Sequence, residues 1–286
     1  MIKRKHPRRH GLLSAVVAAL LLTGWLIWQQ ESIVTETCTV TDPRLPAAFE
    51  GFRIVHLSDL HGKEFGPGNP RLLAKVAELQ PDLIALTGDF IDRAEQVQML
   101  PALLDGLTAI APTYFVTGNH DWAASDGIGA FKSLFAEHGD TVLSGDYVTL
   151  EREGQSIVLA GLDDPNGLIG QTTGPQLRAK IVAAEGSDTY SILLSHRDTP
   201  EEYAQWGFHL ALCGHGHGGI FRIPLLDRGL LGTDRTLFPD FDGGLYLLDG
   251  NFCVVSRGLG SNTVPFRAFR LFNRPHLPLT ILSHGA

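Results

Sequence analysis

The hydrophobic positions of this chain form one long run near the N-terminus and a series of short runs after it. Residues 11–30 carry no charged side chain, and residues 12–22 are apolar except for Ser14. About 20 helical residues at roughly 1.5 Å each are enough to cross the hydrocarbon core of a bilayer. The run therefore predicts a transmembrane helix over residues 11–30.

The charges that flank this run predict its orientation. Five basic side chains precede it, and the first acidic residue of the chain, Glu31, follows it; the basic residues are Lys3, Arg4, Lys5, Arg8 and Arg9. Because positive charge is retained on the cytoplasmic side, residues 1–10 are expected to be a basic cytoplasmic N-terminus. The chain would then be a single-pass protein of the cell membrane with its body on the extracytoplasmic side.

Three other interpretations of residues 11–30 remain open. A cleaved signal peptide is one, although no A-x-A cleavage site follows Trp28. Arg8-Arg9 before an apolar run also resembles a twin-arginine export signal. A buried core helix is the third, and it fits poorly with so basic a flank.

The short apolar runs predict a single α/β domain over residues 52–286, after a linker over residues 31–51 that contains the turn residues Asp42-Pro43 and Pro46. Runs at 53–57, 83–87 and 113–117 are expected to be strands that alternate with helices, one of which begins at Asn69-Pro70. Further strands are predicted at 190–195 and 209–213, and hairpins at 147–161 and 244–256. This pattern predicts a four-layer αββα sandwich, in which two mixed β-sheets pack face to face and helices flank them.

Composition narrows the class of partner. The formal charge is −8, and the part of the chain after the five N-terminal basic residues is more acidic still. Nucleic acid is therefore not expected as a partner, because its binding requires clustered Lys and Arg. Three cysteines without a C-x-x-C spacing indicate neither a zinc knuckle nor a redox motif. The oligomeric state is left open.

Polar clusters follow five of the predicted strands. They are Ser58-Asp59-Leu60-His61, Gly88-Asp89, Gly118-Asn119-His120-Asp121, Ser195-His196 and Gly214-His215-Gly216-His217. Ligands of α/β sheets gather at the carboxyl ends of strands, so the five clusters are expected to converge. Carboxylates, an amide oxygen and imidazoles without cysteine suit Mn²⁺, Fe or Zn²⁺ in a reactive centre.

The spacing within the clusters suggests how two ions are held. Asp89 stands alone after its strand and is placed to bridge two metals. In an extended segment residues i and i+2 point the same way, so Asp59 and His61 can bind one ion together. The same spacing in His215-Gly216-His217 offers two more imidazoles.

These blocks resemble the D-x-H, GD, GNH(D/E), H and GHxH signature of calcineurin-like metallophosphoesterases over residues 52–282. The N-terminal anchor, residues 215–219 and the ending Phe272-Asn273-Arg274-Pro275 further resemble a bacterial membrane-associated branch of phosphodiesterases. The resemblance implies a first metal on Asp59, His61, Asp89 and His217. It implies a second metal on Asp89, Asn119, His196 and His215. It also implies that His120 assists the leaving oxygen and that Asp121 orients the His120 ring.

The implied activity is hydrolysis of phosphodiester or phosphomonoester bonds by a metal-activated water at a dinuclear centre of divalent ions, Mn²⁺, Fe²⁺/³⁺ or Zn²⁺. A phospholipid headgroup and an envelope metabolite are the substrate classes to consider outside the cytoplasmic membrane. Gly216, His276 and Arg197 depart from the branch pattern, and none of them removes a ligand. The alternative function is a non-catalytic binding module that keeps the metallophosphoesterase fold.

Several other polar residues are expected to be structural. Asp92 is predicted to brace the Gly88-Asp89 loop, and Asp163, Asp164 and Arg257 to form turns and salt bridges. The histidines at positions 56, 138, 209, 276 and 284 fit no ligand spacing. Residues 220–241 are unusually apolar for a loop. They are interpreted as loop core, or as a lip that meets membrane lipid.

Overall fold

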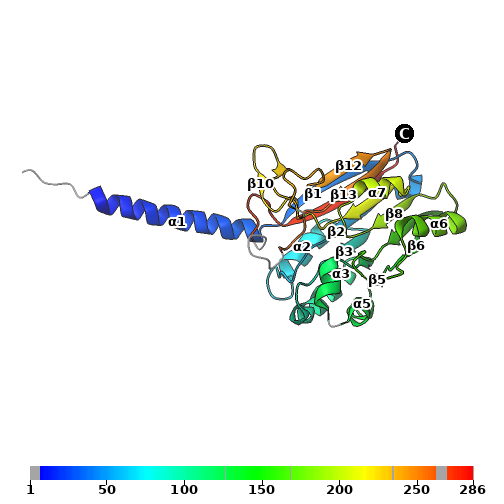
Figure 1. Ribbon diagram of the computed structural model, residues 1–286, viewed down its shortest axis with the longest axis horizontal. Coiled ribbons are helices and arrows are strands. Elements are labelled where there is room, and N and C mark those ends of the chain that lie inside the picture. Colours follow the sequence, from blue (N-terminus) through cyan, green and yellow to red (C-terminus); the bar gives the residue numbers. More distant parts are fainter. Residues whose placement is uncertain (1–6, 126, 168, 234, 262–268, 286) are drawn as a thin grey trace, which may run out of the picture.

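The computed structural model describes residues 7–125, 127–167, 169–233, 235–261 and 269–285. Its body contains two six-stranded sheets (Figure 1). The first has the order β1-β14-β2-β3-β4-β5, with bounds Val34–Thr41, His276–Ser283, Arg53–Leu57, Leu83–Thr87, Thr113–Val116 and Thr141–Val142. The second has the order β12-β13-β9-β8-β7-β6, with bounds Gly244–Leu248, Asn251–Val255, Leu210–Cys213, Ser191–Leu194, Gln155–Gly161 and Asp146–Arg152. Both sheets mix parallel and antiparallel pairs.

Helices cover the outer face of each sheet. The first sheet packs against α2 (Pro70–Glu78), α3 (Leu100–Thr108) and α5 (Ile128–Glu137), and the second against α6 (Gly174–Glu185) and α7 (Pro200–Gln205). The facing surfaces of the two sheets share one apolar cluster that includes Ile54, Leu83, Ile192 and Leu212. The predicted four-layer αββα sandwich is therefore confirmed.

The central strands are apolar along their whole length because both of their faces are covered. Every residue of β3, β8 and β9 is buried. The two predicted hairpins are β6–β7, which turns at Glu153-Gly154, and β12–β13, which turns at Asp249-Gly250. Pro70 begins α2 as expected, but Asn69 does not cap it: Asn69 adopts φ 60°, and its side chain accepts the backbone N–H of Phe65.

The predicted linker over residues 31–51 is wrong, because most of this segment belongs to the body. Residues 34–41 form β1, which pairs with β14 in parallel over eight residues. Cys38 and Val40 point from β1 into the core between the sheets. Residues 47–49 form a short 3₁₀ turn whose Phe49 is also buried.

The N-terminal helix α1 (Pro7–Glu31) projects from the body (Figure 1). Its apolar stretch, Gly11–Glu31, has a mean hydropathy of 2.1 and is not buried, so it is long and apolar enough to cross a membrane. This exposure excludes the buried core helix that the sequence left open. Among the described residues, the contacts of α1 with the body lie in its last turns, where Trp25 packs on Phe272 and the Gln30 amide donates to the Arg270 carbonyl.

The pairing of β1 generates a stability prediction. Val40→Ala should lower the free energy of unfolding by about 2 kcal/mol, since the Val40 side chain is fully buried. Thr39→Ala, at the neighbouring exposed position, should change it by no more than about 0.5 kcal/mol. Urea denaturation of the full chain in detergent measures both. Equal effects of the two substitutions would contradict the packing of β1 into the core.

Candidate metal centre

The predicted ligands come together at the carboxyl ends of β2, β3, β8 and β9 and at the start of α4 (Asn119–Ala124). Five of them lie in the left-handed backbone region, with φ between 50° and 68°: Asp59, His61, Asp89, His215 and His217. The expectation that Asp59 and His61 share an extended segment is therefore wrong. The two side chains converge because the chain coils tightly after β2. Left-handed backbone at bulky residues is uncommon and concentrates at functional sites.

Two glycines allow these loops to approach one another. A Cβ atom at Gly118 would lie 2.2 Å from Oδ1 of Asp89. A Cβ atom at Gly214 would lie 2.3 Å from Oδ2 of Asp59. The loops at the ends of adjacent strands can therefore meet around the carboxylates only because these positions lack side chains.

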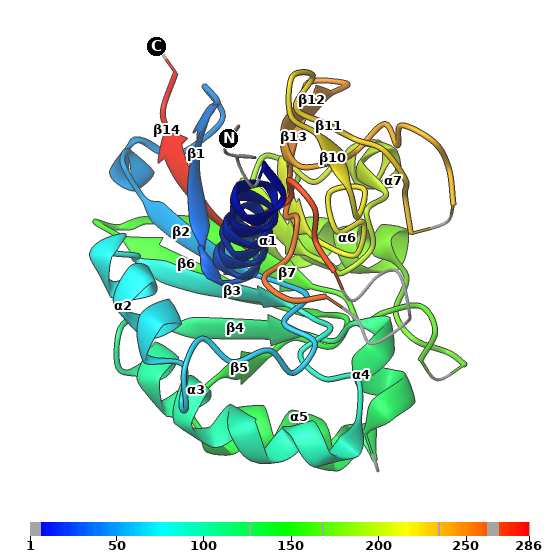
Figure 2. The ribbon, with the colours of Figure 1, turned by 90° about the vertical axis from the view of Figure 1, so that its left-hand side faces the viewer.

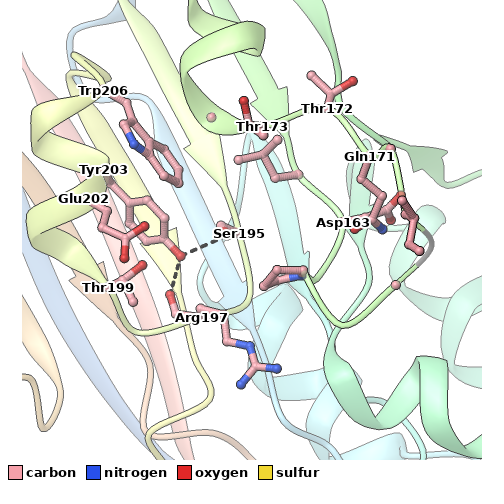
Figure 3. Close-up of a pocket in the computed structure, with 16 residues that line it drawn as sticks. Asp163, Gln171, Thr172, Thr173, Ser195, Arg197, Thr199, Glu202, Tyr203 and Trp206 are labelled. Carbon is pink, nitrogen blue, oxygen red and sulfur yellow. Dashed lines mark hydrogen bonds between the residues drawn. The ribbon is translucent and has the colours of Figure 1, made fainter.

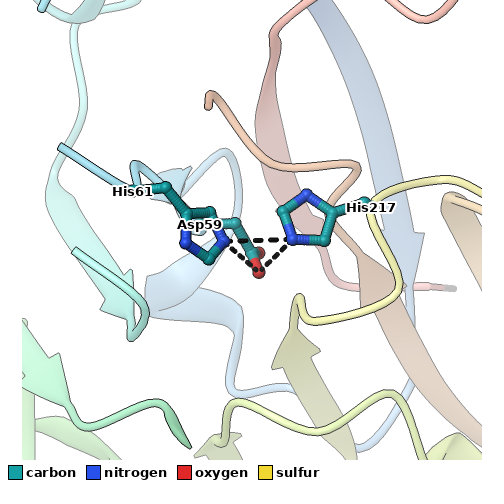
Figure 4. Close-up of side chains that lie close together, drawn as sticks. All are labelled: Asp59, His61 and His217. Atoms are coloured by element: carbon teal, nitrogen blue, oxygen red, sulfur yellow. Dashed lines mark hydrogen bonds and ion pairs between the residues drawn. The ribbon is translucent and has the colours of Figure 1, made fainter. Parts of the chain in front are cut away.

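Asp59, His61 and His217 form the first group of ligands (Figure 4). The Nε2 atoms of His61 and His217 are 3.0 Å apart, and Oδ1 of Asp59 lies 3.9 Å and 3.5 Å from them. Two nitrogens that each lie about 2.1 Å from one ion are themselves about 3 Å apart. The spacing of these rings therefore fits a single cation between them.

Asp89, His196 and His215 form the second group, with Asn119 beside them. Nε2 of His196 lies 3.2 Å from Oδ2 of Asp89, 3.2 Å from Oδ1 of Asn119 and 3.2 Å from Nδ1 of His215. The same Asp89 oxygen lies 3.8 Å from Nε2 of His61. Asp89 thus faces both groups, as a bridging carboxylate must.

Hydrogen bonds outside the centre fix which ring nitrogen faces it. Nδ1 of His61 donates to Asp92 at 2.6 Å, and Nδ1 of His196 donates to the Thr87 carbonyl at 2.7 Å. Each ring therefore presents Nε2 to the centre, which is the arrangement of metal-binding histidines. Arg197 donates to Nε2 of His215 at 3.0 Å. If Nδ1 of His215 bound a metal, Nε2 would carry the ring proton. Nε2 could then no longer accept the hydrogen bond from Arg197, and this bond would be lost.

The electrostatics of the centre favour cations. Burial lowers the pKa of His196, but the Asp89 carboxylate outweighs it and raises this pKa to about 10. A divalent cation would supply the positive charge that this proton supplies. Burial, together with the nearby His61 ring, holds the pKa of His217 well below its usual value, so that its nitrogen lone pair stays available. The donor set and its charges fit two divalent ions.

Comparison with known proteins agrees with this geometry. Residues 52–219 match the calcineurin-like phosphoesterase family. The chain belongs to this family. It is therefore a hydrolase of phosphoester bonds, and members of the family use divalent metals.

Three relatives show which members of the family this chain resembles. It is 29% identical to the uncharacterized metallophosphoesterase YkuE of Bacillus subtilis, over 92% of this chain and 94% of that protein. It is 31% identical to a bovine (Bos taurus) transmembrane protein with a metallophosphoesterase domain, over 92% of this chain but 61% of the relative. It is 38% identical over 119 residues to the UDP-2,3-diacylglucosamine pyrophosphatase LpxG of Chlamydia muridarum, which is 39% of this chain and 36% of the relative. The apolar helix and the transmembrane relative together indicate that this phosphoesterase is a membrane protein.

The two aspartates near His120 have exchanged the roles that the sequence analysis gave them. Nδ1 of His120 lies 2.9 Å from Oδ1 of Asp92, which also holds His61, so Asp92 orients both rings. Asp121 is fully buried and accepts the backbone N–H groups of Asp89, Phe90 and Gly118. Asp121 therefore braces the Gly88-Asp89 loop, and the prediction that it orients His120 is wrong.

The His120 side chain is 30% exposed and stands at the rim of the centre. Burial lowers its pKa, but the hydrogen bond to Asp92 and the Asp89 charge outweigh burial and raise it above the usual value. The contact between Asp92 and His120 was not predicted from the sequence. Its sequence signal is that Asp92 follows Asp89 by three residues, and the coiling of the loop decides which side chain Asp92 meets.

A cavity of about 490 Å³ adjoins the centre across Arg197 (Figure 3). Tyr203 from α7 and Trp206, just after α7, line one side of it. The other side is lined by Leu162, Asp163, Pro165, Gly167 and residues 169–174. Asp164 binds Arg197 through both carboxylate oxygens, at 2.6 Å and 3.0 Å. The salt bridges predicted for Asp163 and Arg257 are also present: Asp163 pairs with Lys132, and Arg257 pairs with Glu36.

The histidines excluded by spacing lie outside both ligand groups. His56 is buried and contacts the hydroxyl of Thr87, and His276 is buried and contacts Glu36. His209 contacts Ser191. All three cysteines are buried and free. These residues serve the core rather than the centre.

The position of Asp89 between the two groups predicts the metal content. We expect two Mn²⁺ per chain after loading and desalting, and fewer for Asp89→Asn, because an amide cannot supply the negative charge shared by two cations. Elemental analysis of the loaded protein measures this. The exposed Asp188→Asn is the matched control and should retain the wild-type content. Full loading of Asp89→Asn would contradict a bridging role.

The contacts of Asp92 predict a separate effect. Asp92→Asn should lower turnover about 10-fold to 100-fold, the usual cost of losing the partner of a site histidine. Asp121→Asn should instead reduce thermal stability, since its buried carboxylate accepts three backbone N–H groups. Steady-state rates and thermal unfolding of both variants separate the two roles. A turnover loss confined to Asp121→Asn would show that the sequence-based assignment was right.

Proposed function

We propose that this phosphoesterase is a two-metal hydrolase of phosphodiester bonds that acts on a phosphorylated headgroup outside the cytoplasmic membrane. The observation that carries the proposal is the placement of Asp89, whose Oδ2 faces His196 on one side and His61 on the other. Two divalent cations supply positive charge to the phosphate and lower the pKa of bound water toward neutrality. The metal ligands in the proposal are Asp59, His61, Asp89, Asn119, His196, His215 and His217.

His120 is the proposed general acid. Its Nδ1 is held by Asp92, which leaves Nε2 free to donate a proton to the leaving oxygen. Burial lowers the pKa of the ring, but the hydrogen bond to Asp92 raises it, and this bond stabilises the protonated form that a general acid requires. The backbone N–H of His120 also donates to Oδ1 of Asp89, so the ring and the bridging carboxylate keep a fixed relation.

The surroundings of the centre support a diester rather than a monoester. Arg197 lies beside His215 and provides a cation at the edge of the centre for an anionic substrate. The cavity on its far side has room for a second substituent on the phosphate, and aromatic and apolar side chains line much of it.

The anchor supports a membrane location for the reaction. With residues 1–10 in the cytoplasm and α1 across the bilayer, the body over residues 32–286 would lie on the outer side. The name of the relative LpxG, a UDP-2,3-diacylglucosamine pyrophosphatase, indicates a substrate that contains a diacylated sugar. A lipid headgroup is accordingly the proposed substrate class.

Hydrolysis of chromogenic esters tests this proposal. The full chain with Mn²⁺ should cleave bis-p-nitrophenyl phosphate faster than p-nitrophenyl phosphate. His120→Asn should reduce kcat on the diester by about 10²-fold to 10⁴-fold, the usual contribution of a general acid, while it keeps bound metal. Release of nitrophenolate and elemental analysis provide the two readouts, with Asp188→Asn as control. If wild type and Asp89→Asn are equally inactive while the wild type holds two metals, the chain is a binding module rather than an enzyme.

A further inference from the structure

Two exposed leucines form an apolar tip on the body. Leu225 is 97% exposed and Leu226 is 64% exposed, in the turn between the short strands β10 (Arg222–Ile223) and β11 (Arg228–Gly229). The two strands pair with each other as a separate two-stranded sheet. Two adjacent leucines at the end of this hairpin present apolar side chains to the surroundings, and burial of that area on a partner would be favourable.

The hairpin holds this apolar tip in a fixed position. The guanidinium of Arg222 is buried and donates to the carbonyls of Gly218 and Asp242 at 3.3 Å and 2.6 Å. The same group pairs with the Asp227 carboxylate at 3.0 Å, which offsets the acidic charge next to the leucines. Asp242 in turn accepts the backbone N–H of Gly229. The hairpin is therefore a structured projection.

Residues 270–274, which we call the joint, connect this hairpin to the end of α1. The N–H of Arg222 donates to the Leu271 carbonyl at 3.1 Å. The N–H of Arg270 donates to the Gln30 side chain at 3.1 Å, and the guanidinium of Arg274 lies 4.8 Å from the ring centre of Trp28. The last turns of α1 and the first residue of β10 both contact the joint. The apolar tip therefore lies on the side of the body from which α1 projects (Figure 1).

The joint also holds the metal centre. The side-chain amide of Asn273 donates to the carbonyls of His217 and Ile220 at 2.7 Å and 3.2 Å. Lys63, two residues after His61, pairs with Glu31 at the end of α1. The ends of β2 and β9 therefore point toward the helix that leaves the body. Figure 2, viewed along α1, shows the helix in front of the sheet edge and the β10–β11 hairpin beside it.

We propose that the apolar tip inserts into the interface of the bilayer that α1 crosses, so that the body has two attachments and the metal centre faces the membrane surface. The occupant is the bilayer itself, because the joint connects the hairpin that carries the tip to the helix that would cross the bilayer. Aliphatic side chains bind this region by burial of their apolar area. The proposal rests on the membrane location of α1 and is independent of catalysis.

Depth-dependent quenching tests the attachment in the full chain reconstituted into phosphatidylcholine and phosphatidylglycerol vesicles. Leu225→Cys is labelled with a bimane fluorophore; the native cysteines are buried and stay unlabelled in the folded protein. Ser156→Cys is the matched control, since Ser156 is exposed near the amino end of β7, whereas the metal centre lies at the carboxyl ends of the neighbouring parallel strands β8 and β9. Lipids brominated along their chains should quench the label at position 225 several-fold more strongly than the label at position 156. Aqueous iodide should show the reverse order.

Other outcomes overturn the proposal. If iodide quenches both labels equally and brominated lipid quenches neither, the apolar tip lies in water. If position 225 is protected from both quenchers, it contacts protein, either a second copy of this chain or another partner. Hydrolysis of bis-p-nitrophenyl phosphate is measured on the same samples. Its absence would refute the proposed activity and leave the quenching result unaffected, so the two proposals fail separately.

Discussion

The structure depends on the burial of two carboxylates, Asp59 and Asp89, at the point where the two sheets meet. Each is at most 1% exposed. Burying a charge is costly unless it is paired and hydrogen-bonded. Imidazoles and backbone N–H groups surround these two: the N–H of His215 donates to Asp59 and that of His120 to Asp89. The strand ends, left-handed loops and glycines together bring imidazoles and N–H groups to both carboxylates. Two buried carboxylates surrounded by imidazoles also form a strong binding site for cations.

That arrangement is held by elements that never touch a ligand atom in the centre. Left-handed backbone at non-glycine residues costs about 1–3 kcal/mol each and persists only when the surrounding structure imposes it. Here β3, β8 and β9 are buried along their whole length and anchor the loops from one end. Asp121 anchors the loop after β3 from the other end by accepting the backbone N–H groups of Asp89 and Phe90. The rigidity of the centre is thus a property of the sheets and of one buried carboxylate beneath it.

The N-terminal helix α1 is connected to the metal centre through the joint. Its last residues bind the joint, and Asn273 of the joint holds the backbone of His217 and Ile220. A flexible tether would leave the orientation of the body free. A helix that ends in contacts with the body instead fixes the orientation of the body relative to the helix.

The sequence by itself determined the elements that depend on local pattern: the apolar runs of β2, β3, β8 and β9, the hairpins at Glu153-Gly154 and Asp249-Gly250, and the polar clusters whose motif indicates a phosphoesterase. Only the tertiary structure decided the rest. Strand β1 looked like a linker because its partner β14 lies more than 230 residues away and its side chains are only partly buried. The roles of Asp92 and Asp121 were exchanged because both follow strand ends at similar distances, and only the left-handed coiling of the loops decides which carboxylate meets an imidazole. The joint contacts α1 across some 240 residues of sequence. No local sequence pattern predicts a contact between segments so far apart.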